Sequence, residues 1–158
     1  TAEKVRELCT ESVVHIVPTK TMAEGYCALS LIDPSASYDE IEKTMLESLE
    51  GTHSGFISIA DKSGVYNGIT VNSGEYIGVV DDDVIVSSTK HKKTALKELT
   101  SAIPGIADVE AVTIFCSTYE GVNDIEISKA EIGVYCPNAE ISVAYGGQGI
   151  YDMVILYQ

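Results

Sequence analysis

Apolar residues in the first third of the chain follow the spacing of helices, interrupted by one continuous apolar run. They recur every three or four residues in three segments, which predicts helices over residues 1–12, 21–32 and 37–51. The second and third segments begin with a capping box, in which Thr or Ser is followed three residues later by Glu: Thr21 with Glu24, and Ser37 with Glu40. Between the first two helices, Val13–Val17 predicts a strand covered on both faces, which Pro18 ends because proline donates no ladder hydrogen bond. We expect this strand, the turn after it and the next helix to organise the core.

From residue 54 onwards the apolar pattern changes to that of short strands. Short apolar runs are separated by turn signals such as Asn67-Gly68, which predicts a small antiparallel meander over residues 54–88. The rest of the chain predicts a helix, a strand, a helix and two strands, over residues 90–103, 111–116, 124–135, 141–145 and 153–157. We therefore expect an α/β fold, with a mixed sheet flanked by helices and a small antiparallel β-meander insertion. Residues 1–158 are expected to form a single domain, with residues 1–53 and 89–158 as its core.

The charge of the chain restricts the partners that it can bind. With 24 acidic and 10 basic residues the net charge is -14, whereas nucleic acids and anionic membrane surfaces both require a basic face. The acidic surface serves either solubility or contact with a basic protein partner. No apolar run approaches the roughly 18 residues of a membrane span, so we expect no span and a cytoplasmic location. The four cysteines contain no Cys-x-x-Cys pair and lie in apolar stretches, so buried thiols are expected rather than disulfides or a zinc site.

The polar turn Thr19-Lys20-Thr21 is the best isolated candidate for a binding site. It lies between a predicted strand and the N-terminus of a predicted helix, where α/β folds commonly bind anions. The Lys20 ammonium group and nearby backbone N–H groups are suited to a phosphate or a carboxylate. A capped turn with an exposed lysine would explain the same residues, and the glycines of a P-loop are absent.

A second candidate is the glycine-rich link between the last two predicted strands. Tyr145, Gly146, Gly147, Gln148 and Gly149 are suited either to close approach of another surface or to a tight turn. Tyr76 and Tyr151 also lie beside glycines, and tyrosine is common in interfaces, although core packing would explain most of these side chains.

No catalytic or metal site is expected from the residues themselves. The three histidines are scattered, so they suggest no nucleophile–His–acid arrangement. Asp81-Asp82-Asp83 lacks the alternating ligands and central glycine of a calcium loop, so we expect a solvated turn there. We therefore predict neither catalytic residues nor metal ligands.

Three motifs along the chain, taken in order, resemble those of one protein family. Residues 16–25 read IVPTKTMAEG, similar to V-I-P-T-K-T-x-x-Q-G with Glu24 in place of Gln. Ser54-Gly55, Asn67-Gly68 and residues 74–78 resemble the spaced pattern T-G, D-G and G-D-[FY]-I-G. Residues 145–151 resemble Y-G-G-Q-P-x-Y with a glycine in place of the proline. The family is that of the dihydroxyacetone-kinase-like proteins, which includes the ATP-binding subunit of bacterial fatty acid kinase, and the likeness is to their C-terminal region.

The resemblance implies a longer parent kinase, of which this chain would be a C-terminal part lacking the first elements of that region. ATP and Mg²⁺ would bind in the N-terminal domain of the parent, so no cofactor is expected in this chain, which is not expected to be catalytic itself. The implied partner is a DegV-like fatty-acid-binding protein. Two alternatives stay open: a domain that holds a small anionic substrate for phosphoryl transfer, and a structural dimerisation domain that forms a homodimer. The candidate contact residues are Thr19, Lys20, Thr21, Tyr76, Tyr145, Gly146, Gly147, Gln148 and Tyr151.

Overall fold

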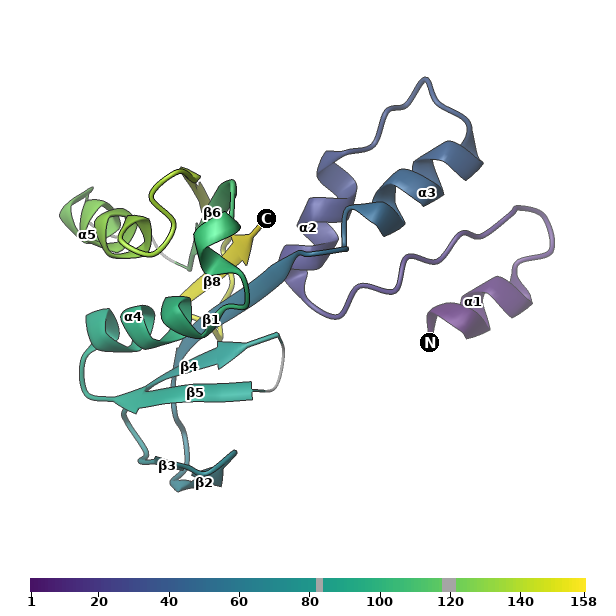
Figure 1. The fold of residues 1–158 in the computed structure, drawn as a ribbon. Helices are drawn as coiled ribbons and strands as arrows, with labels where there is room; N and C mark the ends of the chain where they lie inside the picture. The colour runs from purple at the N-terminus through teal and green to yellow at the C-terminus, as the bar shows by residue number, and fades with distance from the viewer. Residues whose placement is uncertain (82–83, 118–121) are drawn as a thin grey trace. The chain divides into compact units, whose positions relative to one another are not determined.

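The chain divides into two compact units (Figure 1). The computed structural model describes residues 1–81, 84–117 and 122–158. The N-terminal unit is Thr1–Gly51 and the C-terminal unit is Thr52–Gln158. Of the predicted turn Asp81-Asp82-Asp83, the last two residues lie outside the described ranges. Asp81 has a positive φ of 46° and accepts a hydrogen bond from the backbone N–H of Ser54 at 2.9 Å, so it belongs to a turn that is tied to the sheet.

Three helices form the regular structure of the N-terminal unit, and each overlaps a predicted one. Their bounds are α1 Ala2–Leu8, α2 Met22–Ser30 and α3 Tyr38–Glu47. Both predicted capping boxes are present, with Thr21 at the start of α2 and Ser37 at the start of α3. The thiol of Cys27 in α2 donates to the backbone carbonyl of Ser48, directly after α3, at 3.3 Å. The two longer helices of this unit therefore pack together as a pair.

The predicted strand Val13–Val17 is wrong. Residues 9–20 contain neither helix nor strand, and Val13 is 84% exposed. An extended run becomes a strand only where a neighbouring backbone pairs with it, and none of the strands in the described ranges does so here. A side-chain contact holds this segment instead, because His15 Nδ1 lies 2.7 Å from Glu42 Oε2 of α3. The expectation that this run organises the core is also wrong, since the large sheet lies in the C-terminal unit.

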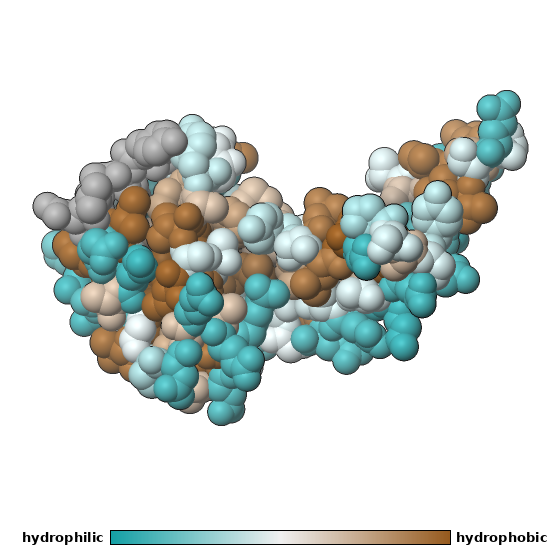
Figure 2. Space-filling view, turned by 90° about the horizontal axis from the view of Figure 1, so that it is seen from above, coloured by the Kyte–Doolittle hydropathy of each residue, from teal (hydrophilic) through white to brown (hydrophobic). Residues whose placement is uncertain are grey.

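The N-terminal unit buries few of its side chains. All of its residues are described, and the buried ones are Thr21, Ala23, Cys27 and Ala28. Large apolar side chains such as Leu8 and Leu29 remain more than half exposed. In Figure 2 brown apolar residues accordingly reach the surface on the right, where this unit lies. Local capping and helix pairing therefore contribute much of the order in this unit.

A six-stranded mixed sheet forms the centre of the C-terminal unit, in the strand order β5-β4-β1-β8-β6-β7 (Figure 1). The bounds of its strands are β1 His53–Ile59, β4 Tyr76–Val80, β5 Val84–Thr89, β6 Ala111–Cys116, β7 Glu140–Tyr145 and β8 Met153–Tyr157. Neighbouring strands are antiparallel except β6 and β7, which run parallel and are connected through α5 (Val122–Gly133). The predicted class, an α/β fold with a mixed sheet flanked by helices, is confirmed.

A separate two-stranded antiparallel sheet consists of β2 (Gly64–Tyr66) and β3 (Ile69–Val71). Asn67 and Gly68 join them with φ values of 50° and 81°, as a two-residue type I′ turn requires. The small antiparallel sheet expected within residues 54–88 is therefore this hairpin. The neighbouring strands β1, β4 and β5 do pair antiparallel, but they join the main sheet because β8 occupies the other edge of β1.

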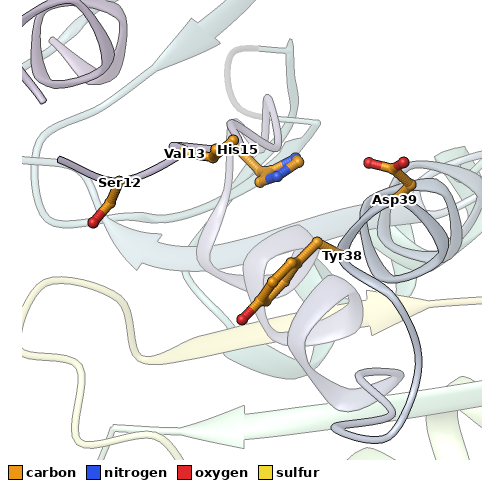
Figure 3. Close-up of a pocket in the computed structure, with 5 residues that line it drawn as sticks. All are labelled: Ser12, Val13, His15, Tyr38 and Asp39. Atoms are coloured by element: carbon orange, nitrogen blue, oxygen red, sulfur yellow. The ribbon is translucent and has the colours of Figure 1, made fainter. Parts of the chain in front are cut away.

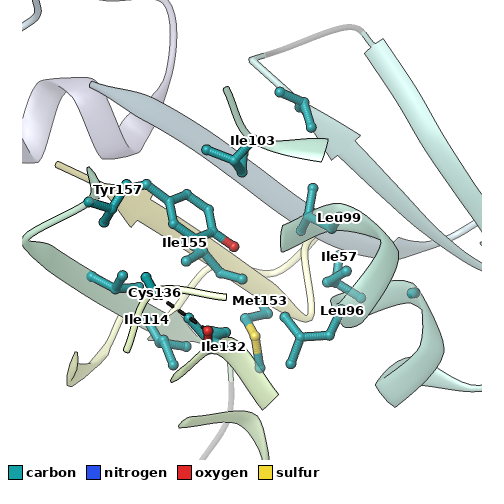
Figure 4. Packing of buried hydrophobic residues seen from close by; sticks show 14 of the residues in the cluster. Ile57, Leu96, Leu99, Ile103, Ile114, Ile132, Cys136, Met153, Ile155 and Tyr157 are labelled. Atoms are coloured by element: carbon teal, nitrogen blue, oxygen red, sulfur yellow. Dashed lines mark hydrogen bonds between the residues drawn. The ribbon is translucent and has the colours of Figure 1, made fainter. Parts of the chain in front are cut away.

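Helices α4 (Lys92–Ala102) and α5 cover one face of the main sheet, which we call the helix face. The one-turn 3₁₀ helix η1 (Ile106–Asp108) follows α4. Buried side chains from α4, α5 and the helix face form one core, shown in Figure 4: Ile57, Leu96, Leu99, Ile103, Ile114, Ile132, Cys136, Met153, Ile155 and Tyr157. Because side chains alternate along a strand, Phe56, Phe115 and Val154 lie on the opposite face, which we call the second face.

Two glycines of the second family motif allow α4 to approach the sheet. A Cβ atom on Gly55 would lie 2.9 Å from Leu99 Cδ2, and one on Gly78 would lie 3.2 Å from Leu99 Cβ. Leu99 is fully buried, so larger residues in β1 or β4 would push α4 outward. This part of the motif therefore serves packing rather than a binding site.

Polar contacts fix α4 on both of its sides. On the buried side, Thr100 Oγ1 lies 3.0 Å from the Tyr157 hydroxyl group. On the outer side, Glu131 of α5 accepts from Lys93 at 2.6 Å and from Lys97 at 3.1 Å. These two lysines hold the pKa of Glu131 below its usual value. None of the helices in the described ranges is long and apolar enough to cross a membrane.

Candidate functional site

The candidate residues of the C-terminal unit gather at one end of the main sheet. In the strand register, Cys116 lies opposite both Tyr145 and Met153, and Ile59 lies opposite Tyr76. β1, β6 and β7 therefore finish at the end where β4 and β8 begin. The link between β7 and β8 crosses this end, and we call its residues 145–151 the glycine loop.

The glycine loop is tied to two strands of the sheet. The backbone N–H of Gly146 donates to the carbonyl of Cys116 at 3.0 Å, which extends the β6–β7 ladder by one residue. Gln148 Nε2 donates to the carbonyl of Phe115, also in β6, at 2.7 Å. At the other end of the loop, Ser58 Oγ of β1 donates to the carbonyl of Ile150 at 3.1 Å. These contacts hold the loop against the sheet end.

An aromatic contact completes the attachment of the loop. The Tyr151 ring lies on the Phe56 ring of β1, with centroids 4.8 Å apart and planes 30° apart. Phe56 pairs with Val154, and Val154 pairs with Phe115, so these three residues form a row across the second face. Gln148 and Tyr151 thus attach the loop at the two ends of that row.

The side chains of the loop differ in direction. Tyr145 is 60% exposed and Ile150 is 80% exposed, whereas the Oε1 atom of Gln148 is buried. Gly147 has a positive φ of 64°, a conformation that other residues rarely adopt. Ile150 was missed by the sequence prediction, although an isolated apolar residue between Gly149 and Tyr151 in a short link is a signal of exposure.

Tyr76 lies at the same sheet end but has a different environment. It is half-buried and packs against the core on the helix face. Next to it, Glu75 accepts hydrogen bonds from Asn72 at 3.1 Å and from Ser88 at 2.9 Å, which lower the pKa of its carboxyl group. An ionised carboxylate therefore flanks this side of the sheet end.

The candidate residues of the N-terminal unit form the start of α2. Thr21 Oγ1 accepts a hydrogen bond from the backbone N–H of Glu24 at 3.1 Å. In return, Glu24 Oε2 accepts from the backbone N–H of Lys20 at 2.5 Å and from that of Thr21 at 3.4 Å. Thr19 and Lys20 are exposed. The backbone groups suited to bind an anion at this turn already donate to a carboxylate of the chain itself.

A cavity of about 530 Å³ lies elsewhere in the N-terminal unit, and Figure 3 shows the residues that line it: Ser12, Val13, His15, Tyr38 and Asp39. The His15 ring stacks on Tyr38 at 6.3 Å, and its Nδ1 atom is engaged by Glu42. The Ser12 hydroxyl group points away from His15 in Figure 3, so the two do not form a nucleophile–base pair.

A smaller cavity of about 270 Å³ lies in the C-terminal unit, beside the β2–β3 hairpin. It is lined by Ala60, Asp61, Lys62, Tyr66, Val71, Ile77 and Ile85. Most of this lining is apolar, and Lys62 and Asp61 contribute opposite charges. Within the described ranges, no group of three or more His, Cys, Asp or Glu side chains is placed to hold a metal ion.

A mixed sheet covered by helices on one face, with a tethered loop presenting exposed side chains at its end, defines an α/β domain with a surface suited to binding. Solved structures share this fold. The chain aligns with a DegV family protein from Corynebacterium glutamicum at a TM-score of 0.65 and 14% identity, covering 98% of this chain and 66% of that one. A fatty acid binding DegV family protein from Streptococcus agalactiae aligns at 0.57 and 14%, covering 98% and 63%.

The chain belongs to the FakA-like C-terminal family of fatty acid kinase proteins, whose model matches residues 1–158. The resemblance inferred from the three motifs is thereby confirmed. Uncharacterized proteins of Staphylococcus aureus strains MRSA252 and USA300 are 25% identical over 137 residues, which are 87% of this chain. The chain spans about a quarter of the length of these relatives, since the match covers 25% of each.

Proposed function

We propose that this chain is a partner-binding accessory domain of a fatty-acid-kinase-type protein, and that the glycine loop is its contact surface. The observation that carries the proposal is the attachment of this loop to β1 and β6, which presents Tyr145 and Ile150 outward. A loop ordered in advance loses less conformational entropy on binding, and exposed aromatic and aliphatic side chains are common anchors of interfaces.

The proposed partner is a DegV-like protein that carries the fatty acid. Family membership supports this choice, because the parent of such a domain would phosphorylate an acyl group held by a separate protein. In this scheme ATP and Mg²⁺ bind in another domain of the parent, the reaction takes place in the cytoplasm, and this chain supplies no catalytic group. The two chains would then share a fold, since the solved neighbours are DegV family proteins.

Two other functions receive less support. A small anionic substrate at Lys20 would have to displace Glu24 from the two backbone N–H groups that it occupies. A homodimer would need a self-complementary surface, and sedimentation or light scattering of the chain at high concentration would detect it directly.

Calorimetric titration of the chain with a DegV-like protein from the same organism tests the proposal. We expect saturable binding, and we expect Ile150→Ser to weaken it at least about fivefold, as for a central interface side chain. Val65→Ser is the matched control, because Val65 is also β-branched and is 71% exposed on the separate hairpin. Absence of binding, or equal weakening by the two variants, would overturn the proposal.

A further inference from the structure

We infer that Gln148 is a positioning residue that holds the glycine loop to β6, and that it does not itself contact a partner. The inference rests on the proposed function only in its binding arm. Gln148 is a candidate contact residue by sequence, whereas the structure turns its amide group toward the sheet. Its Nε2 atom donates to the Phe115 carbonyl at 2.7 Å, and its Oε1 atom is buried without a hydrogen-bond partner among the described residues.

Gly146 provides the space that this amide group occupies. A Cβ atom on Gly146 would lie 2.0 Å from Gln148 Oε1 and 3.0 Å from Gln148 Cδ. Its next neighbour, Phe115 Cβ, would lie at 3.1 Å. Gly147 has a positive φ whereas Gly146 does not, so the two glycines have different reasons. Gly147 is needed for the backbone turn, and Gly146 is needed for the Gln148 side chain.

The other attachments of the loop lie at its far end. Ser58 holds the carbonyl of Ile150, and the Phe56 ring supports Tyr151. Gln148 is therefore the side chain that restrains the middle of the loop, between the end of β7 and Ile150. Without it, the backbone of residues 147–149 loses its link to the sheet, and the spacing between Tyr145 and Ile150 is no longer held. The sequence Gly-Gly-Gln thus encodes a shaped loop, in which the polar residue faces inward.

A double-mutant cycle read by amide hydrogen exchange tests this inference in the free chain. Gln148→Ala should speed exchange of the amides of residues 147–150 about three- to tenfold, as expected for loss of one hydrogen bond. Gly146→Ala should do the same, because it displaces the amide group of Gln148. The double variant should exchange no faster than Gln148→Ala alone, since the added methyl group then enters vacated space. Additive effects would overturn the inference.

Gly149→Ala is the matched control for the cycle. A Cβ atom there would meet nothing within 4 Å, and Gly149 has no positive φ, so loop exchange should remain that of the wild type. An equal acceleration in this variant would show that any added methyl group loosens the loop, which would also overturn the role of Gln148.

The binding arm separates positioning from contact. In Gly146→Ala the Gln148 side chain is still present and is pushed outward, so a contact role predicts retained affinity for the DegV-like protein. A positioning role predicts that Gly146→Ala and Gln148→Ala weaken binding equally, about three- to tenfold. Retained affinity in Gly146→Ala would overturn the inference. If the wild-type chain does not bind, the proposed partner is wrong, whereas the exchange cycle still decides the role of Gln148.

Discussion

Tyr157 carries a hydroxyl group into the apolar core, and the loss of that group has a well-defined expected effect. Tyr157 and Thr100 are both fully buried, with 3.0 Å between their hydroxyl oxygens. Tyr157→Phe removes one buried hydrogen bond and leaves Thr100 Oγ1 without this partner. A buried polar group that loses its partner costs about 1–3 kcal/mol. We expect a loss of that size in the free energy of unfolding, measured by urea denaturation with an unchanged dependence on urea.

Thr100→Val should destabilise by a similar amount, because it leaves the Tyr157 hydroxyl group unpaired instead. The double variant buries two apolar groups of nearly the same shape, so its cost should fall at least about 1 kcal/mol below the sum of the single costs. A Tyr157→Phe variant as stable as the wild type, or strictly additive costs, would refute the assignment of this pair.

The same hydroxyl group makes stability depend on alkaline pH. Burial raises the pKa of Tyr157 well above its usual value, so the folded state keeps a proton that the unfolded state loses. The contribution is complete below a pH of about 10 and is lost as the pH rises above it, reaching about 1.4 kcal/mol by about pH 11. The stability advantage of the wild type over Tyr157→Phe should shrink accordingly. A constant difference between pH 9 and 11 would contradict this reasoning.

Three further variants test the packing, the exposed run and the charges. Gly55→Ala should cost about 1–3 kcal/mol in unfolding free energy, because its Cβ atom would approach Leu99 Cδ2 to 2.9 Å. Val13→Ser should change that free energy by less than about 0.5 kcal/mol, whereas a buried strand would lose far more. Glu131→Gln should be less stable than the wild type at neutral pH, and the difference should disappear as the pH falls below about 4, because the lowered pKa of Glu131 stabilises only the ionised form. An unchanged difference at low pH would contradict the lysine contacts.

Local patterns predicted those elements that depend on neighbours in sequence. The capping boxes at Thr21 and Ser37 involve residues three positions apart, and the Asn67-Gly68 turn is defined by two backbone conformations. Both are present because nothing distant decides them. Val13–Val17 has the composition of a buried strand, but pairing with another strand decides whether it becomes one, and composition does not contain that information.

The candidate site shows the same division at the level of side chains. Sequence identified the glycine loop, since glycines between two strong strands are locally conspicuous. The inward direction of Gln148 depends on the carbonyl of Phe115, which is 33 positions away in the chain. The exposure of Ile150 depends on Ser58 holding its carbonyl, across 92 positions. Which residues of the loop face outward could therefore be known only once β1 and β6 were placed beside it.

The start of α2 allows one more test, of whether the turn at Lys20 binds anions. Glu24 accepts from the backbone N–H groups of Lys20 and Thr21, so its carboxylate acts as an internal anion at the helix N-terminus. Glu24→Gln keeps the shape of the capping box but removes the charge, which should cost about 0.3–1 kcal/mol of unfolding free energy. In the wild type, inorganic phosphate should produce no saturable shift of the Lys20 and Thr21 amide resonances. Saturable binding in the wild type, lost in Lys20→Ala, would show that the turn holds an anionic substrate despite Glu24.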